Sequence, residues 1–255
     1  MEEKIVLEIC ANSVDSALAA QQGGADRVEL CDNLSEGGTT PSYATLAKTR
    51  ELLHISLYAL IRPRGGDFLY DDMEFDLIAR DIGICKQLGY DGVVIGLLQA
   101  DGRVDKKRTR WLTELAWPMG VTFHRAFDDS RDPMAALEDI LEAGCERILT
   151  SGQRPTAPEG AALLGRLVNQ AGHRIAVMAG SGIRVDNIAS LVRQTRGREF
   201  HATAKVDRKS AMQHVGMLFS RGQKEASSQV TDAGLVRELR RQAEAARRDM
   251  DEEVV

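Results

Sequence analysis

Two copies of one short pattern carry the residues of this chain that are best suited to chemistry. The pattern is apolar–acid–apolar–cysteine, and it occurs at residues 7–10 (LEIC) and 28–31 (VELC), each time within a run rich in Ile, Val and Leu. Residues two apart in a β-strand share a face, so each acid points the same way as the cysteine of its copy. The four side chains are Glu8, Cys10, Glu29 and Cys31.

The segment between the two copies predicts how these strands are arranged. The stretch from Ser13 to Gln22 is long enough for a helix, so the two strands should run parallel and be joined by a crossover connection. Helices then cover the apolar face, and the acids and thiols must face elsewhere. We expect them to face the inside of a closed barrel, near its open end.

Two neighbouring acids in such a place have a functional and a structural interpretation. Buried carboxylates need partners, and Glu8 and Glu29 would each be paired with Arg62 or Arg64 if they served stability alone. Close acids also raise each other's pKa, which suits one of them for general acid/base catalysis. His124 taken alone fits a core or helix-capping role. Together the four residues Glu8, Glu29, Arg62 and His124 are the candidate catalytic set.

The cysteine pair has three interpretations. Side chains of neighbouring strands approach closely, and two soft thiolates suit Cu(I). The same spacing permits a disulfide, or two buried thiols that behave as small hydrophobic groups. Because the chain has no C-x-x-C motif, spacing alone favours the inert pair for Cys10 and Cys31. Cys85, on a helix stripe, and Cys145, at the start of a strand, are expected to be structural.

A candidate anion site follows the seventh expected strand. Gly180, Ser181 and Gly182 form a Gly-rich turn, and barrels often bind phosphate in the loops after strands seven and eight. Thr150 and Ser151, after the sixth strand, would support the same site. The structural alternative is a tight turn that needs glycine only for its backbone conformation.

The elements that must position these residues alternate regularly between strand and helix. Polar side chains gather after the strands, and among them Arg125 and Asp128 should pair with each other or brace their loop. Expected strands lie near residues 7–10, 28–31, 55–61, 91–97, 121–124, 147–150, 175–178 and 200–202. Such alternation predicts a parallel sheet covered by helices, and eight units in about 250 residues fit a (β/α)8 TIM barrel.

The whole chain, 1–255, is interpreted as a single TIM-barrel domain. Residues of about 205–230 are polar and should be irregular, and an Arg-rich amphipathic helix is expected at about 232–250. The alternative is a doubly wound open sheet. It is disfavoured because the first turn after a strand, residues 10–13, lacks the Gly-rich dinucleotide fingerprint.

Composition limits the classes of function. The chain has 255 residues and a formal net charge of −5, which gives no general attraction to nucleic acid or acidic membranes. No run approaches the roughly 20 apolar residues of a membrane span, and the acidic start is unlike a signal peptide. Four cysteines in a chain of this size do not form a disulfide framework. We expect a cytoplasmic protein with reduced thiols.

Several blocks of the sequence resemble the CutC family, in order along the chain. They are LEIC (7–10), GADRVELC (24–31), EGGTTPS (36–42), IRPRGGDF (61–68), FHRAFD (123–128) and LTSG (149–152). The resemblance extends to about Ala204, and Ser210-Ala211-Met212 is similar to a further family feature. It implies a cytoplasmic barrel, a homodimer or higher oligomer, and a role in copper homeostasis. The Cu(I) site proposed for the family falls on Cys10 and Cys31.

Two hypotheses for function follow, with different partners. In the first, a CutC-like protein of copper homeostasis binds Cu(I) through Cys10 and Cys31 at the barrel mouth. In the second, an enzyme acts on a small phosphorylated or carboxylated metabolite: Glu8 or Glu29 is the acid/base, Arg62 and His124 stabilise negative charge, and residues 180–182 hold an anion. A third alternative is a noncatalytic oligomeric scaffold, in which Glu29→Gln would mainly change stability.

Overall fold

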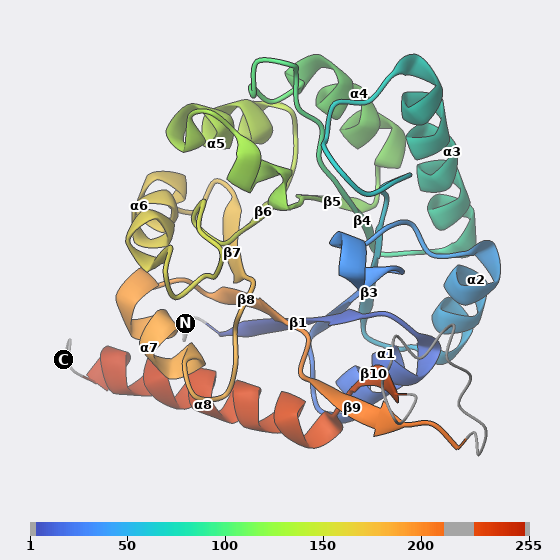
Figure 1. The fold of residues 1–255 in the computed structure, drawn as a ribbon. Coiled ribbons are helices and arrows are strands. Elements are labelled where there is room, and N and C mark those ends of the chain that lie inside the picture. Colours follow the sequence, from blue (N-terminus) through green and yellow to red (C-terminus); the bar gives the residue numbers. More distant parts are fainter. Residues whose placement is uncertain (1–3, 212–226, 253–255) are drawn as a thin grey trace.

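The alternation of short apolar runs and capped helices folds into a closed barrel (Figure 1). The computed structural model describes residues 4–211 and 227–252. The barrel strands are β1 (Val6–Ala11), β2 (Arg27–Leu30), β3 (Ser56–Leu60), β4 (Gly92–Ile95), β5 (Gly120–Phe123), β6 (Arg147–Thr150), β7 (Ala176–Gly180) and β8 (Glu199–Ala202). Each strand pairs in parallel with the next, and β8 closes onto β1. The expected (β/α)8 TIM barrel is therefore confirmed.

Helices surround the barrel and bury its outer apolar face (Figure 1). They are α1 (Val14–Gln22), α2 (Tyr43–Leu52), α3 (Asp72–Leu88), α4 (Lys106–Ala116), α5 (Pro133–Glu142), α6 (Ala161–Ala171), α7 (Ile188–Thr195) and α8 (Ala233–Glu252), with the short 3₁₀ turns η1 (Leu34–Glu36) and η2 (Arg125–Asp129). The last helix agrees with the expected range of about 232–250.

Local side-chain chemistry explains where several helices begin and end. Ser13 and Ser42 accept hydrogen bonds from backbone N–H groups at the starts of α1 and α2. Asp71 and Glu74 form a complete capping box at the start of α3. Gly89 ends that helix with a φ of 76°, a left-handed conformation in which glycine avoids the steric penalty of a Cβ atom. These caps place each following strand at a defined point.

Strand register decides which side chains share a level inside the barrel. Glu8 on β1 is level with Arg27 on β2 and with His201 on β8. Two residues further along β1, Cys10 is level with Glu29. Cys10, Glu29 and Cys31 line the interior cavity, and Glu8 pairs with Arg27 and His201 at the same level, so the acids and thiols of the repeated pattern face the enclosed centre.

The segment expected to be irregular contains an ordered ribbon at its two ends. β9 (Lys205–Lys209) and β10 (Ser227–Thr231) pair in antiparallel register beside the barrel (Figure 1). The prediction of an irregular stretch at 205–230 is therefore wrong at both ends, because main-chain hydrogen bonds can stabilise a ribbon of polar residues. The rest of that stretch, and Met212 of the family-like feature, lie outside the described residues.

The final helix closes the layer of helices around the first and last units of the barrel. α8 buries Val236, Leu239, Ala243 and Ala246, and it lies against α7 and α1. Apolar residues at helical spacing make this stripe. Within residues 4–211 and 227–252, no helix has the length and apolar character needed to cross a lipid bilayer.

Candidate functional site

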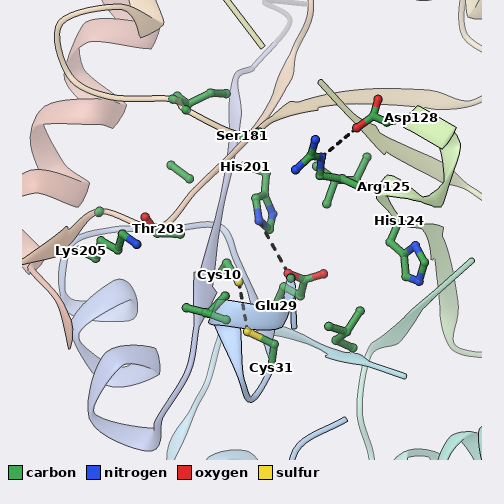
Figure 2. Close-up of a pocket in the computed structure, with 18 of the residues that line it drawn as sticks. Cys10, Glu29, Cys31, His124, Arg125, Asp128, Ser181, His201, Thr203 and Lys205 are labelled. Atoms are coloured by element: carbon green, nitrogen blue, oxygen red, sulfur yellow. Dashed lines mark hydrogen bonds and ion pairs between the residues drawn. The ribbon is translucent and has the colours of Figure 1, made fainter. Parts of the chain in front are cut away.

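A cavity of about 1060 Å³ opens at the carboxyl ends of the barrel strands (Figure 2). Four of its lining residues, Cys10, Glu29, Cys31 and His201, carry reactive or metal-binding groups and lie close together, and we call them the floor cluster. Apolar side chains such as Leu60, Phe68 and Leu149 line other parts of the same cavity. A largely apolar cavity with a few polar groups is the usual form of a small-molecule site.

The two cysteines of the repeated pattern meet in this cluster. Cys10 Sγ and Cys31 Sγ lie 3.2 Å apart, and both side chains are buried. They are free cysteines, because a disulfide would hold the sulfurs at about 2.05 Å. Contact with Cys31 and then burial raise the pKa of Cys10 well above its ordinary value, and negative charge on Glu29 acts in the same direction. Cys10 is therefore a neutral thiol at neutral pH.

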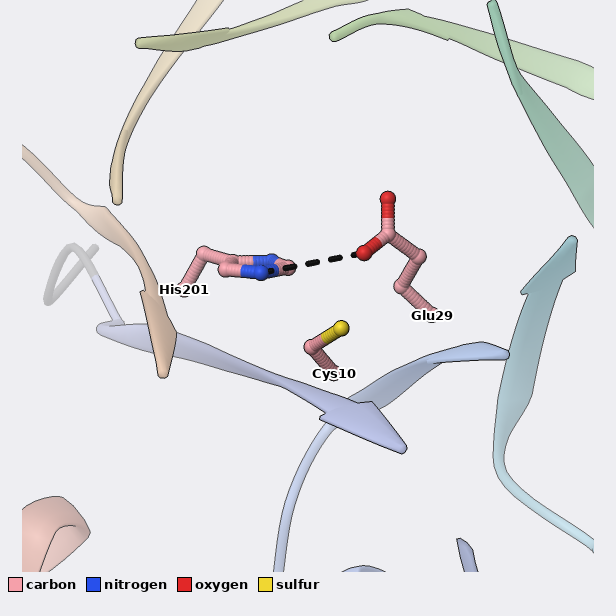
Figure 3. Close-up of side chains that lie close together, drawn as sticks. All are labelled: Cys10, Glu29 and His201. Carbon is pink, nitrogen blue, oxygen red and sulfur yellow. Dashed lines mark ion pairs between the residues drawn. The ribbon is translucent and has the colours of Figure 1, made fainter. Parts of the chain in front are cut away.

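His201 connects the two acids of the pattern. Its Nδ1–H donates to Glu8 Oε1 at 2.7 Å, and its Nε2 lies 3.7 Å from Glu29 Oε2 (Figure 3). Burial alone would lower the pKa of His201, but the charge of Glu29 and the hydrogen bond to Glu8 outweigh burial and raise it. Burial also raises the pKa of Glu29. The Glu29–His201 pair therefore holds its protons more tightly than free side chains would.

Three of these groups are close enough to share one metal ion. Ligand atoms of Cys10, Glu29 and His201 all lie within 4.8 Å of one another. Cys31 is in contact with Cys10, so two sulfurs, one imidazole nitrogen and one carboxylate converge on the same side of the cavity (Figures 2 and 3).

Glu8 differs from the expectation, because its cationic partner is neither Arg62 nor Arg64. Its carboxylate is fully buried and pairs with Arg27, in addition to its bond with His201. Burial would raise the pKa of Glu8, but the Arg27 charge and the His201 hydrogen bond lower it far below its ordinary value. Glu8 is thus an ionised carboxylate that holds His201 in place.

A layer of ion pairs below the floor cluster fills the barrel interior, and it was not expected from the sequence. Arg27 and Arg147 both contact Glu199, at 2.7 and 2.5 Å. Arg147 also contacts Glu146 at 2.7 Å, and Tyr58 donates to Glu146 at 2.6 Å. The sequence signal was available in part, since Arg27 and Glu29 share a strand face, as do Glu199 and His201.

Arg62 lines the cavity but makes no contact with either acid of the pattern. Its Nη1 donates to the carbonyls of Glu36 and Gly38 at 2.7 and 2.9 Å, and its Nη2 donates to that of Gly66 at 2.7 Å. Arg64 instead pairs with Glu74 and Asp67. The structural interpretation that paired both acids with these arginines is therefore wrong.

His124 lines the cavity from the end of β5. Its Nδ1 accepts the backbone N–H of Ala126 at 3.0 Å, so the helix-capping role is present in η2. Burial, and then the Arg62 charge, lower the pKa of His124 to about 3. The ring is neutral at physiological pH, and it lies away from the Glu29–His201 pair in Figure 2.

The proposed anion loops divide into two groups. The Asp128 carboxylate accepts hydrogen bonds from the Thr150 hydroxyl and from the Ser151 backbone and hydroxyl, at 2.5 to 3.1 Å. It also pairs with Arg125 at 2.8 Å, as the sequence predicted. Thr150 and Ser151 are thus engaged by the protein's own carboxylate. Gly180 ends β7, and Ser181 and Gly182 line the cavity.

Comparison with known proteins agrees with the fold and the repeated pattern. A model of the CutC family matches residues 5–206. The chain belongs to the CutC family. CutC of Chromobacterium violaceum is 59% identical over 239 residues, covering 92% of this chain and 96% of that protein. The human copper homeostasis protein cutC homolog is 46% identical, covering 92% and 87% of the two chains.

Solved structures give the same result. CutC of Streptococcus agalactiae matches with a TM-score of 0.75 and 32% identity, covering 78% of this chain and 98% of that one. Thiamine phosphate pyrophosphorylase of Pyrococcus furiosus matches with a TM-score of 0.59 at 14% identity, covering 96% and 98%. At that identity the second likeness shows the barrel fold alone.

Proposed function

We propose that this CutC-family protein binds Cu(I) at the barrel mouth through Cys10 and Cys31, with His201 as a third ligand, and serves copper homeostasis in this way. The observation that carries the proposal is the 3.2 Å approach of two buried sulfurs beside an imidazole. Soft thiolates are preferred ligands of Cu(I). The names of the relatives, which refer to copper homeostasis, support the same assignment.

The surroundings of His201 suit a ligand histidine. Because Glu8 accepts the Nδ1–H, Nε2 is the nitrogen that faces Glu29 and Cys10. A carboxylate behind the imidazole is the common support of metal-binding histidines, since it fixes the tautomer and ring orientation. Glu29 offers a hard oxygen ligand, which Cu(I) prefers less than sulfur, so we assign it no coordination role.

Protons must leave the site before copper binds. The raised pKa values of Cys10 and His201 mean that both groups keep their protons to a higher pH than free side chains would. Metal ligands bind in the deprotonated form, so affinity should increase as the pH rises. The site is therefore expected to release copper more readily at low pH.

An anaerobic competition titration against a chromophoric Cu(I) chelator tests this function. The variant Cys10→Ser/Cys31→Ser should lose competition with the chelator, whereas Cys85→Ser/Cys145→Ser, which removes the two buried cysteines elsewhere, should retain it. Equal copper affinity in the first variant and the wild type would refute the proposal.

A second candidate function rests on the size of the cavity. At about 1060 Å³ it is far larger than one ion needs and reaches the volume of small-molecule sites. We propose as this alternative a TIM-barrel enzyme that acts on a small phosphorylated or carboxylated metabolite. Glu29, whose pKa is raised by burial, would be the general acid, and Glu8 would position His201.

Turnover, measured separately from binding, tests the alternative. A panel of phosphorylated and carboxylated metabolites is screened by thermal shift, and the stabilising compounds are followed by NMR for conversion to product. Glu29→Gln should still bind a true substrate but convert it at least about 100-fold more slowly, the usual contribution of a general acid. Equal rates in Glu29→Gln and the wild type would exclude Glu29 from the chemistry.

A further inference from the structure

Three arginines are buried among the described residues, and one of them lacks an anionic partner. Arg27 and Arg147 both contact the Glu199 carboxylate. Arg62 is only 5% exposed, yet its guanidinium donates to three neutral backbone carbonyls, and no carboxylate oxygen of the described residues lies within 4.0 Å of it. A buried charge is costly without a counter-charge, so this cation calls for an anion from outside the chain.

A second unsatisfied group lines the same cavity. His124 Nε2 is buried and has no hydrogen-bond partner among the residues that the structure describes. Because Nδ1 accepts the Ala126 N–H, the hydrogen of the neutral ring is on Nε2, which is therefore a donor. Unpaired buried donors are rare in folded proteins and call for an explanation.

Phe68 joins the two residues. The Arg62 guanidinium carbon lies 5.0 Å from the centre of the Phe68 ring, and the His124 ring centre lies 5.0 Å from it as well. Arg62, Phe68 and His124 all line the cavity that contains the floor cluster. The Tyr70 hydroxyl is near enough for the Arg62 charge to oppose the burial that raises its pKa. A neutral phenol does not balance a cation.

We propose that Arg62 and His124 form an anion-binding subsite that takes the oxyanion group, carboxylate or phosphate, of a small metabolite. The guanidinium supplies the charge and His124 Nε2–H supplies a hydrogen bond. The low dielectric of the cavity strengthens both the ion pair with the guanidinium and the hydrogen bond from His124 to the charged oxygen. The subsite places the remainder of the bound molecule in the cavity that Glu29 and His201 line.

This inference deepens the second candidate function and rests on it only for what happens to the bound molecule. Binding of metabolites by the wild type without any conversion to product would refute the enzyme and leave the subsite intact. The cysteine variants used to test Cu(I) should bind the anion as the wild type does.

Titration with malonate and with inorganic phosphate, against chloride at equal ionic strength, tests the subsite. The 15N-labelled imidazole signals are recorded by NMR, and His124 should shift on binding while His173, exposed on the outside of the barrel, should not. A shift of the His124 signal with malonate alone would identify a carboxylate subsite, and a shift with phosphate alone would identify a phosphate subsite. A shift with both anions would identify a general oxyanion subsite. A His124 signal that neither anion moves would overturn the proposal.

Variants separate this subsite from Arg184 and Lys205, two exposed cations that line the same cavity. Arg62→Gln and His124→Asn should each lower the affinity for the anion about tenfold or more, as expected for the loss of a hydrogen bond to a charged group. Asn at position 124 retains an acceptor for the Ala126 N–H but lacks the Nε2 donor, so it provides a test should Arg62→Gln fail to fold. Arg184→Gln/Lys205→Gln, at more exposed cavity positions, should change affinity less than about twofold. The reverse pattern would contradict the assignment.

Discussion

At the scale of single residues, His201 connects the parts of the site. Its Nδ1–H donates a hydrogen bond to Glu8, and its Nε2 approaches Glu29 and Cys10. On the sequence alone, His124 is the expected catalytic imidazole, and no role is assigned to His201. The assignment of Glu8, Glu29, Arg62 and His124 as catalytic stays a prediction. The structure brings Glu8 and Glu29 to one imidazole and packs both Arg62 and His124 against Phe68.

Replacement of Glu8 by Gln should destabilise the fold strongly. The change removes the negative charge between Arg27 and His201, and breaking a buried ion pair costs about 3–5 kcal/mol. Urea unfolding should show a lower midpoint. The control is Glu138→Gln, which breaks an exposed pair with Arg174 and should leave the midpoint nearly unchanged. Similar effects from both changes would contradict the central role of Glu8.

Replacement of Glu29 by Gln should change how stability depends on pH. The folded pKa of Glu29 is raised above 4.5, so its contribution is present at low pH and is lost as the pH rises through the folded value. The free energy of unfolding of the wild type should therefore fall more steeply above pH 4.5 than that of Glu29→Gln. Urea unfolding at a series of pH values measures both slopes. Parallel curves would show that Glu29 titrates normally.

At the scale of elements, Gly96 at the end of β4 leaves room for the imidazole of His124 at the end of β5. A Cβ atom on Gly96 would lie 2.4 Å from two atoms of the His124 ring. The close approach of these strand ends therefore requires glycine, although the sequence contains no turn signal there. A contact between loops also positions the site. The Asp128 carboxylate, in the loop after β5, accepts hydrogen bonds from backbone N–H groups of the loop after β6 and so holds the two loops together.

The substitution Gly96→Ala should move His124 and destabilise the protein. Overpacking in a tight interior typically costs about 1–3 kcal/mol. Gly83→Ala, on the α3 helix where a Cβ would meet nothing within 4 Å, should stabilise by up to about 1 kcal/mol. Thermal unfolding measures both changes, and a lower anion affinity in Gly96→Ala alone would link the glycine to the subsite. Stabilisation by both substitutions would refute the steric argument.

At the scale of the whole molecule, the barrel combines distant parts of the chain into one interior. β8 closes onto β1, so His201 meets Glu8 across 193 positions of sequence. α8 then packs its buried stripe over the same region. The expected homo-oligomer stays a prediction, which sedimentation velocity can test. Trp117 is 74% exposed and is a suitable fluorescent reporter of a contact surface.

Removal of one buried side chain of α8 should show that this helix belongs to the cooperative fold. Leu239 is 1% exposed, and Leu→Ala at such a site costs about 2–5 kcal/mol. The free energy from urea unfolding should fall by that amount in a single transition. Leu77→Ala, at a half-exposed position of α3, is the control and should cost much less. A separate early transition in Leu239→Ala would instead show that α8 unfolds independently.

The sequence by itself determined the alternation of strands and helices, the helix caps, and the faces that Glu8, Cys10, Glu29 and Cys31 share. These follow from local periodicity and capping chemistry, which short segments carry within themselves. Tertiary structure alone decided which cations meet the acids. Strand register selected Arg27, and barrel closure selected His201, because the partners of a buried charge depend on distances between segments that are far apart along the chain.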